Sequence, residues 1–101
     1  MFEDIKERLM YALRHSLHAH QHIVGTQQDM LCVVDDTHCV HVLYASVHRD
    51  NSVELSYYCV MGLNGLRVVQ NVETTVAEYH DFCVEVQKTP AFKDSARLLC
   101  R

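Results

Sequence analysis

Histidine and cysteine are the residues of this sequence most able to do chemistry, and the chain of 101 residues has eight of the first and five of the second. His15, His18 and His22 recur at intervals of three and four, which on a helix would align their imidazoles on one face. Such an array can hold a transition metal. A solvated polar face, a partner contact or a pH-sensitive patch explains the same spacing. We therefore expect no bound metal or other cofactor, and keep these three as the metal candidates.

A second group joins Cys39 and His41 on one strand-like run to His80 and Cys83 on a later helical one. If the helix crosses that strand, two thiolates and two imidazoles could close a tetrahedral zinc site. The same residues could supply a cysteine nucleophile and its histidine base. The spacing differs from that of zinc fingers, and no glycine-rich elbow marks an oxyanion hole. A metal-binding or cysteine-dependent enzyme is therefore the alternative function, and buried neutral thiols are the simpler explanation.

Composition narrows the class of protein. Hydrophobic residues make up 49% and charged residues 22%, which is typical of one globular domain over residues 1–101. The net charge of −4 argues against a nucleic-acid partner, because nucleic acids bind to basic protein surfaces. The acidic start predicts no signal peptide, and no apolar run is long enough to span a membrane. Because the cysteines are odd in number and form no C-x-x-C pair, we expect reduced thiols in the cytoplasm.

Helical spacing predicts the first element. Apolar residues recur every three or four positions from Phe2 to Val24, so we expect one amphipathic helix over residues 2–23 that stops at Gly25. Its first turns carry acids, which the helix dipole favours there. This helix would present His15, His18 and His22 on the side opposite its buried stripe.

Four strand-like runs follow, over residues 29–34, 38–48, 53–63 and 66–72. Polar turns at residues 35–37 and 49–52 separate the first three runs. Asn64 and Gly65 both tolerate positive φ, which favours a two-residue hairpin before the fourth run. Connections this short favour an antiparallel meander.

Helical period returns after residue 74. Thr75 and Glu78 form a capping box, with each side chain able to bond the other residue's backbone N–H, and a buried stripe at Val76, Tyr79, Cys83 and Val86 follows. Thr89-Pro90 ends this helix and can start a short final one. The sequence thus predicts a two-layer α+β fold, α-β-β-β-β-α-α. A four-stranded antiparallel meander would carry an N-terminal helix and one or two C-terminal helices.

Both faces of the predicted sheet are apolar. The second run places Val40, Val42 and Tyr44 on one side and Leu43 and Ala45 on the other. Either the helices divide between the two faces, or another chain covers one of them. The second possibility predicts a small interaction module, an inhibitor or an adaptor, that binds a protein partner or forms a homodimer.

The expected contact residues are of two kinds. Apolar and aromatic anchors would dominate the contact, at Leu43, Tyr44, Tyr58 and Val60. An acidic rim at Asp35, Asp36 and Asp50 would steer the chain toward a basic partner. Because histidine titrates near neutral pH, we expect any charge-steered association to depend on pH between about 5 and 7.

Overall fold

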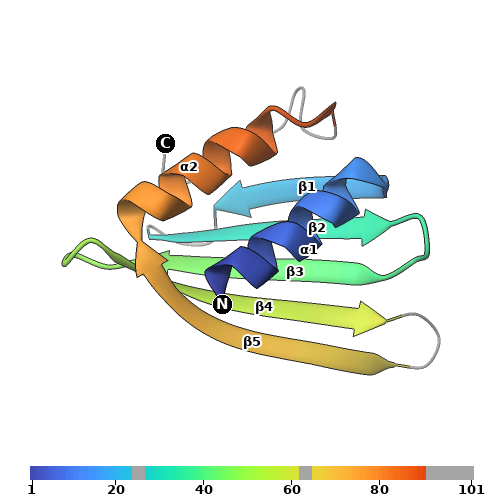
Figure 1. Ribbon diagram of the computed structural model, residues 1–101, viewed down its shortest axis with the longest axis horizontal. Helices are drawn as coiled ribbons and strands as arrows, with labels where there is room; N and C mark the ends of the chain where they lie inside the picture. The colour runs from blue at the N-terminus through green and yellow to red at the C-terminus, as the bar shows by residue number, and fades with distance from the viewer. Residues whose placement is uncertain (24–26, 62–64, 91–101) are drawn as a thin grey trace.

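A computed structural model describes residues 1–23, 27–61 and 65–90. Its elements are α1 (Phe2–Arg14), β1 (Ser16–Ile23), β2 (Gln28–Asp35), β3 (Val40–Val47), β4 (Ser52–Met61), β5 (Leu66–Thr75) and α2 (Val76–Gln87). The strands form one antiparallel sheet in the order β1-β2-β3-β4-β5, so each strand pairs with its neighbour in the chain. Both helices lie on the same side of this sheet (Figure 1). The expected α+β meander is confirmed, with five strands instead of four.

The helix predicted over residues 2–23 is wrong in its second half. α1 ends at Arg14, and residues 16–23 form β1. Histidine at positions 18, 20 and 22 alternates with other residues, so the segment also has the period of two that a strand requires. Pairing along β2, from Ser16 opposite Asp35 to Ile23 opposite Asp29, satisfies the backbone groups of the segment that face β2, and β1 forms an edge of the sheet. The predicted stop at Gly25 and the predicted final helix lie outside the described residues.

The core lies between the helices and one face of the sheet. Phe2 of α1 and Phe82 of α2 join the two helices, with their rings edge to face and 5.9 Å between centroids. Alternate residues of β2, β3 and β4 point toward these helices and are buried: Leu31, Val33, Leu43, Ala45, Val53, Leu55, Tyr57 and Cys59. Neither described helix is long and apolar enough to cross a membrane.

The start of α2 and the turn before β5 agree in most respects with the local sequence patterns. The side chain of Thr75 accepts a hydrogen bond from the Glu78 backbone N–H at 3.2 Å, as a capping box requires. The Glu78 carboxylate accepts instead from the Thr74 hydroxyl, at 2.9 Å, so the reciprocal half of the box differs from the prediction. Gly65 has a φ of +66°, as the predicted hairpin needs, while Asn64 lies outside the described residues.

A buried hydrogen bond joins α2 to the sheet and gives a testable prediction. The Tyr79 hydroxyl donates to Asp29 Oδ2 at 2.6 Å, and both residues are almost fully buried. Burial raises the pKa of Tyr79, so the hydroxyl keeps its proton and remains the donor. Tyr79→Phe is expected to lower the free energy of unfolding by about 1–3 kcal/mol, because a buried carboxylate loses a donor. Urea unfolding measures this, and Tyr11→Phe at an exposed tyrosine should change little. Equal midpoints for the two variants would contradict the role of the bond.

Candidate functional site

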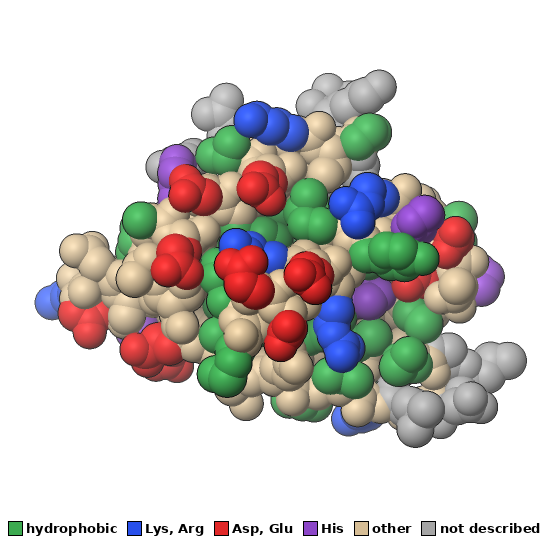
Figure 2. Space-filling model, in the orientation of Figure 1, with side chains coloured by type: hydrophobic (Ala, Val, Ile, Leu, Met, Phe, Trp, Pro, Cys, Tyr) green, Lys and Arg blue, Asp and Glu red, His purple; other side chains and the backbone are tan. Residues whose placement is uncertain are grey.

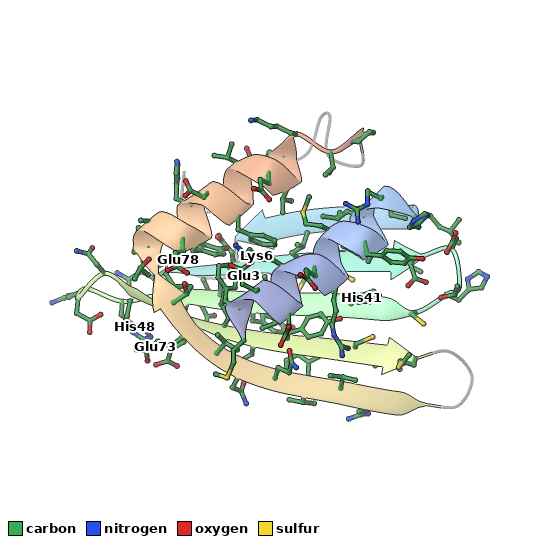
Figure 3. The ribbon with its side chains drawn as sticks, in the orientation of Figure 1. Glu3, Lys6, His41, His48, Glu73 and Glu78 are labelled. Carbon is green, nitrogen blue, oxygen red and sulfur yellow. The ribbon has the colours of Figure 1, made fainter. Side chains whose placement is uncertain are left out.

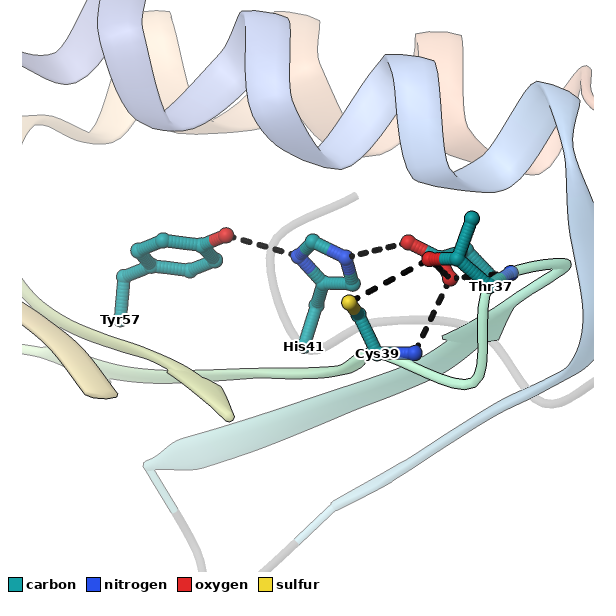
Figure 4. A network of polar contacts seen from close by, with 5 residues as sticks. Thr37, Cys39, His41 and Tyr57 are labelled. Atoms are coloured by element: carbon teal, nitrogen blue, oxygen red, sulfur yellow. Dashed lines mark hydrogen bonds and ion pairs between the residues drawn. The ribbon is translucent and has the colours of Figure 1, made fainter. Parts of the chain in front are cut away.

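Three buried polar side chains form a hydrogen-bonded chain between α1 and the sheet (Figure 4). His41 on β3 lies at the centre, below α1 (Figure 3). Its Nε2 is 3.1 Å from Asp35 Oδ2 and its Nδ1 is 2.7 Å from the Tyr57 hydroxyl oxygen. When Nε2 carries the proton of the neutral ring, it donates to the carboxylate, and Nδ1 accepts from Tyr57. Every polar atom of the imidazole is thus engaged inside the protein.

Asp35 is held by the turn that follows β2. Its Oδ1 accepts from the backbone N–H groups of Thr37 and Cys39, at 2.9 and 3.0 Å, and from the Thr37 hydroxyl at 2.6 Å. Burial raises the pKa of this carboxyl, but the hydrogen bonds from Thr37, His41 and the Cys39 backbone outweigh burial and lower it to about 2. The residue is therefore ionised at neutral pH, and it is buried in the turn, whereas the sequence predicted it on an acidic rim.

This network forms the inner wall of a pocket of about 370 Å³. Three residues of α1 and two each from the β2–β3 turn and β4 complete the lining: Glu7, Arg8, Tyr11, Thr37, Cys39, Cys59 and Met61. Burial raises the pKa of Tyr57, and the neighbouring Cys59 thiol adds to the rise, whereas Arg8 lowers it. Burial also raises the pKa of Cys59. Both groups are neutral at pH 7, so this wall presents thiol, thioether and aromatic surface to the pocket.

The pocket does not contain an activated cysteine. Cys39 Sγ lies 3.3 Å from the Thr37 hydroxyl, whose single proton is directed to the closer Asp35 oxygen. His41 has no ring nitrogen left to take a proton from Cys39, because Asp35 and Tyr57 occupy both. A nucleophile paired with a histidine base needs that contact.

The four residues of the predicted Cys and His site do not come together. Cys39 and His41 line the pocket below α1, whereas His80 lines a different pocket, beside Asp50 at the turn after β3. These two places are at opposite ends of β3, and a strand of eight residues spans roughly 25 Å. Cys83 is buried in the core. The described part of the chain holds no group of three or more His, Cys, Asp or Glu side chains arranged to bind a metal ion.

The predicted histidine array is not helical either. His15 is the residue after α1, and positions 18 and 22 belong to β1. On a strand, residues three apart point to opposite faces, whereas residues four apart, such as positions 18 and 22, share a face. The helical face on which the metal prediction rested is therefore absent, and His15 lies outside the strand that carries the other two positions.

The face of the sheet turned away from both helices carries most of the predicted anchors. Tyr44, Tyr58 and Val60 are each about 40% exposed there, and the two tyrosine rings meet edge to face at 6.2 Å. The same face presents half-buried apolar residues from β2 and β3: Met30, Cys32, Val34, Val40 and Val42. Leu43, by contrast, is buried on the helix side, because it alternates with Val42 and Tyr44. We call this surface the open sheet face.

The two other predicted acidic residues lie in turns. Asp36 is exposed in the turn between β2 and β3. Asp50 is exposed in the turn between β3 and β4, where its carboxylate accepts from the Ser52 backbone N–H and hydroxyl. They are at opposite ends of β3, so they do not form one acidic rim.

The sequence contained one signal for the buried network. His41 occupies the buried side of an alternating strand, and a buried imidazole needs partners for its nitrogens. The partners themselves, Asp35 across a turn and Tyr57 on the next strand, come from the pairing of β3 with both neighbours. Comparison of the chain with protein-family models, curated proteins and solved structures finds no match.

Proposed function

We propose that the chain acts as a protein-interaction module that pairs with a second copy of itself through the open sheet face. The observation that carries the proposal is the apolar character of this face on β2, β3 and β4. Among the described residues of these three strands, Glu54 is the one charged side chain on that face. An apolar surface of this extent on a small domain is a mark of interaction sites. The module would work by assembly, as an inhibitor or adaptor does, and not by turnover.

The distribution of charge favours a second copy as the occupant. Acidic side chains gather over the two helices (Figure 2), where α1 and α2 carry six acids and three bases. Two copies packed through their open sheet faces would turn these acidic layers outward. Stacked sheets are about 10 Å apart, and each helix layer adds about 10 Å more. That separation exceeds the Debye length in physiological salt, so repulsion between the copies would be screened.

The open sheet face is large enough for a small dimer interface. Five strands spaced about 4.8 Å apart and about 26 Å long present roughly 600 Å² of sheet, with apolar side chains on β2, β3 and β4 and the charged Arg67 and Glu73 on β5. Specific interfaces begin at about 600 Å² from each partner. An isologous pair would place the tyrosines of both copies near the twofold axis, since Tyr44 and Tyr58 lie on the central strands. The described cysteines form no disulfide, which fits assembly in a reducing compartment such as the cytoplasm.

Light scattering on two matched lysine variants tests the proposal. Val60 on the open sheet face and Val84 on α2 are 38% and 39% exposed, so the same substitution can be compared on the two layers. The wild-type chain and Val84→Lys are expected to be dimers at micromolar concentration, with twice the mass of the single chain, which is 11.7 kDa. Val60→Lys is expected to shift toward the monomer, because a lysine would be buried without a partner charge.

Two results would count against the second copy. A wild-type mass of one chain at every concentration would exclude self-pairing and leave the face to a different protein. Equal masses for Val60→Lys and Val84→Lys would show that a dimer forms through another surface. Circular dichroism of both variants controls for loss of the fold.

A further inference from the structure

The pocket below α1 is separate from the open sheet face and has its own chemistry. It lies on the helix side of the sheet, and its volume of about 370 Å³ falls in the range that small-molecule sites occupy. Tyr11, Cys39, Cys59 and Met61 supply aromatic and sulfur-containing surface to it. These side chains favour an apolar body over a polar one.

The charged group behind the pocket is not available to a ligand. Asp35 accepts four hydrogen bonds from within the protein, through both carboxylate oxygens. His41 and Tyr57 use their polar atoms on each other and on this carboxylate. The inner wall is therefore a satisfied network, and an entering molecule gains nothing there by carrying a charge. A ligand charge has to be met at the mouth of the pocket.

Arg8 is the cation at that mouth. It comes from the exposed side of α1 and lines the pocket, close enough to Tyr57 and Cys59 to lower the pKa of both groups. Within the described residues it takes no part in an ion pair; those found join Lys6 to Glu3, His41 to Asp35 and His48 to Glu54. Glu7 also lines the rim, as an exposed and solvated carboxylate. A guanidinium at the edge of an apolar pocket matches the planar fork of a carboxylate.

We propose that this pocket binds a small monocarboxylate with an apolar chain. The chain would lie against Tyr11, Cys59 and Met61, and the carboxylate would bind Arg8. This goes beyond self-pairing through the open sheet face, since it concerns the opposite side of the sheet and a different class of ligand.

Octanoate and 1-octanol are the matched probes, because they share the alkyl chain and differ in the charged group. Titration of the ¹⁵N-labelled chain with octanoate is expected to shift the amides of Arg8, Cys39 and Met61 in a saturable way. 1-Octanol is expected to bind about tenfold more weakly, since it cannot form the charged fork with Arg8. Arg8→Gln should abolish this preference, whereas Arg14→Gln, at an exposed arginine outside this pocket, should retain it.

Thiol labelling gives a second readout with an internal reference. Cys39 lines the pocket and Cys32 lies on the open sheet face, and both are partly exposed in the single chain, so the labelling uses Val60→Lys, the variant expected to be monomeric. Octanoate is expected to slow alkylation of Cys39 by iodoacetamide and to leave Cys32 unchanged, as peptide mass spectrometry measures. Protection of Cys32 instead would place the alkyl chain on the open sheet face and overturn the proposal. Absence of saturable shifts, or equal binding of octanoate by the wild type and Arg8→Gln, would overturn it too. Self-pairing is measured separately, by mass, so either proposal can fail alone.

Discussion

Asp35→Ala is expected to lower the free energy of unfolding by about 3 kcal/mol, more than any other single substitution proposed for this chain. The substitution leaves the backbone N–H groups of Thr37 and Cys39 and the Nε2 of His41 without their acceptor. The His41 ring is buried and the two turn N–H groups take part in part-buried bonds, so water replaces the lost acceptor incompletely. For a domain of this size the melting temperature should fall by roughly 15 °C, which scanning calorimetry or urea unfolding can measure.

Asp36→Ala is the matched control for this loss. Asp36 is the next residue in the same turn, and it is exposed to solvent. Its substitution should change the free energy of unfolding by less than about 0.5 kcal/mol, as is usual for surface positions. If the two alanine variants were equally stable, the carboxylate of Asp35 would not be the anchor of the turn.

The second large effect is a loss of stability in acid. The pKa of Asp35 is about 2 in the folded chain, whereas an aspartate in an unfolded chain has its ordinary pKa of 3.8. Since the folded state holds the proton less tightly, ionised Asp35 stabilises the fold above about pH 4, and this contribution disappears as pH falls toward 2. A shift of this size corresponds to about 2 kcal/mol.

The difference between wild type and Asp35→Ala isolates this contribution from the titration of other acids. Their free energies of unfolding, measured by urea at a series of pH values, should differ by about 3 kcal/mol at neutral pH and about 1 kcal/mol near pH 2. Asp36→Ala should follow the wild type through the whole series. A difference that stays constant with pH would mean that the charge of Asp35 contributes nothing.

Strands with strong alternation were predictable from the sequence. The runs predicted over residues 29–34, 38–48, 53–63 and 66–72 correspond to β2, β3, β4 and β5, with ends displaced by a few residues. Alternation works in β4 because each buried residue has its partner in the core and each intervening one faces outward. The start of α2 was predictable for a similar reason, because the cap at Thr75 is local chemistry.

Whether residues 16–23 form a helix or a strand depends on their contacts with another strand, which the spacing of residues within the segment does not reveal. Leu13 and Leu17 continue the helical interval of α1, so the period of that helix extends past its real end. The alternating histidines at 18, 20 and 22 were the competing signal. Pairing with β2 decides between them, because residues 29–35 supply hydrogen-bond partners to residues 16–23 as a second strand. Tertiary pairing overrides local period in such segments.

The candidate site was predictable only in part. Alternation identified Tyr44, Tyr58 and Val60 as members of one face, but it gave no means of telling which face the helices cover. Leu43 was therefore placed among the contacts although it is buried. Asp35 looked like an ordinary turn residue, since its partner His41 is brought to it by the hairpin geometry of β2 and β3.

The contact between Phe2 and Phe82 has a consequence for how the chain matures on the ribosome. The strands of the meander can pair one after another as they emerge, because each strand pairs with the one made just before it. The helical layer cannot, because α1 is made first and needs α2, the last described element, beside it. At about 5–20 residues per second, synthesis keeps the helix side of the nascent sheet incompletely covered for several seconds. During that interval α1 alone packs on the helix side of the nascent sheet, and the apolar residues that α2 will cover are exposed, as chaperones require of the chains they bind.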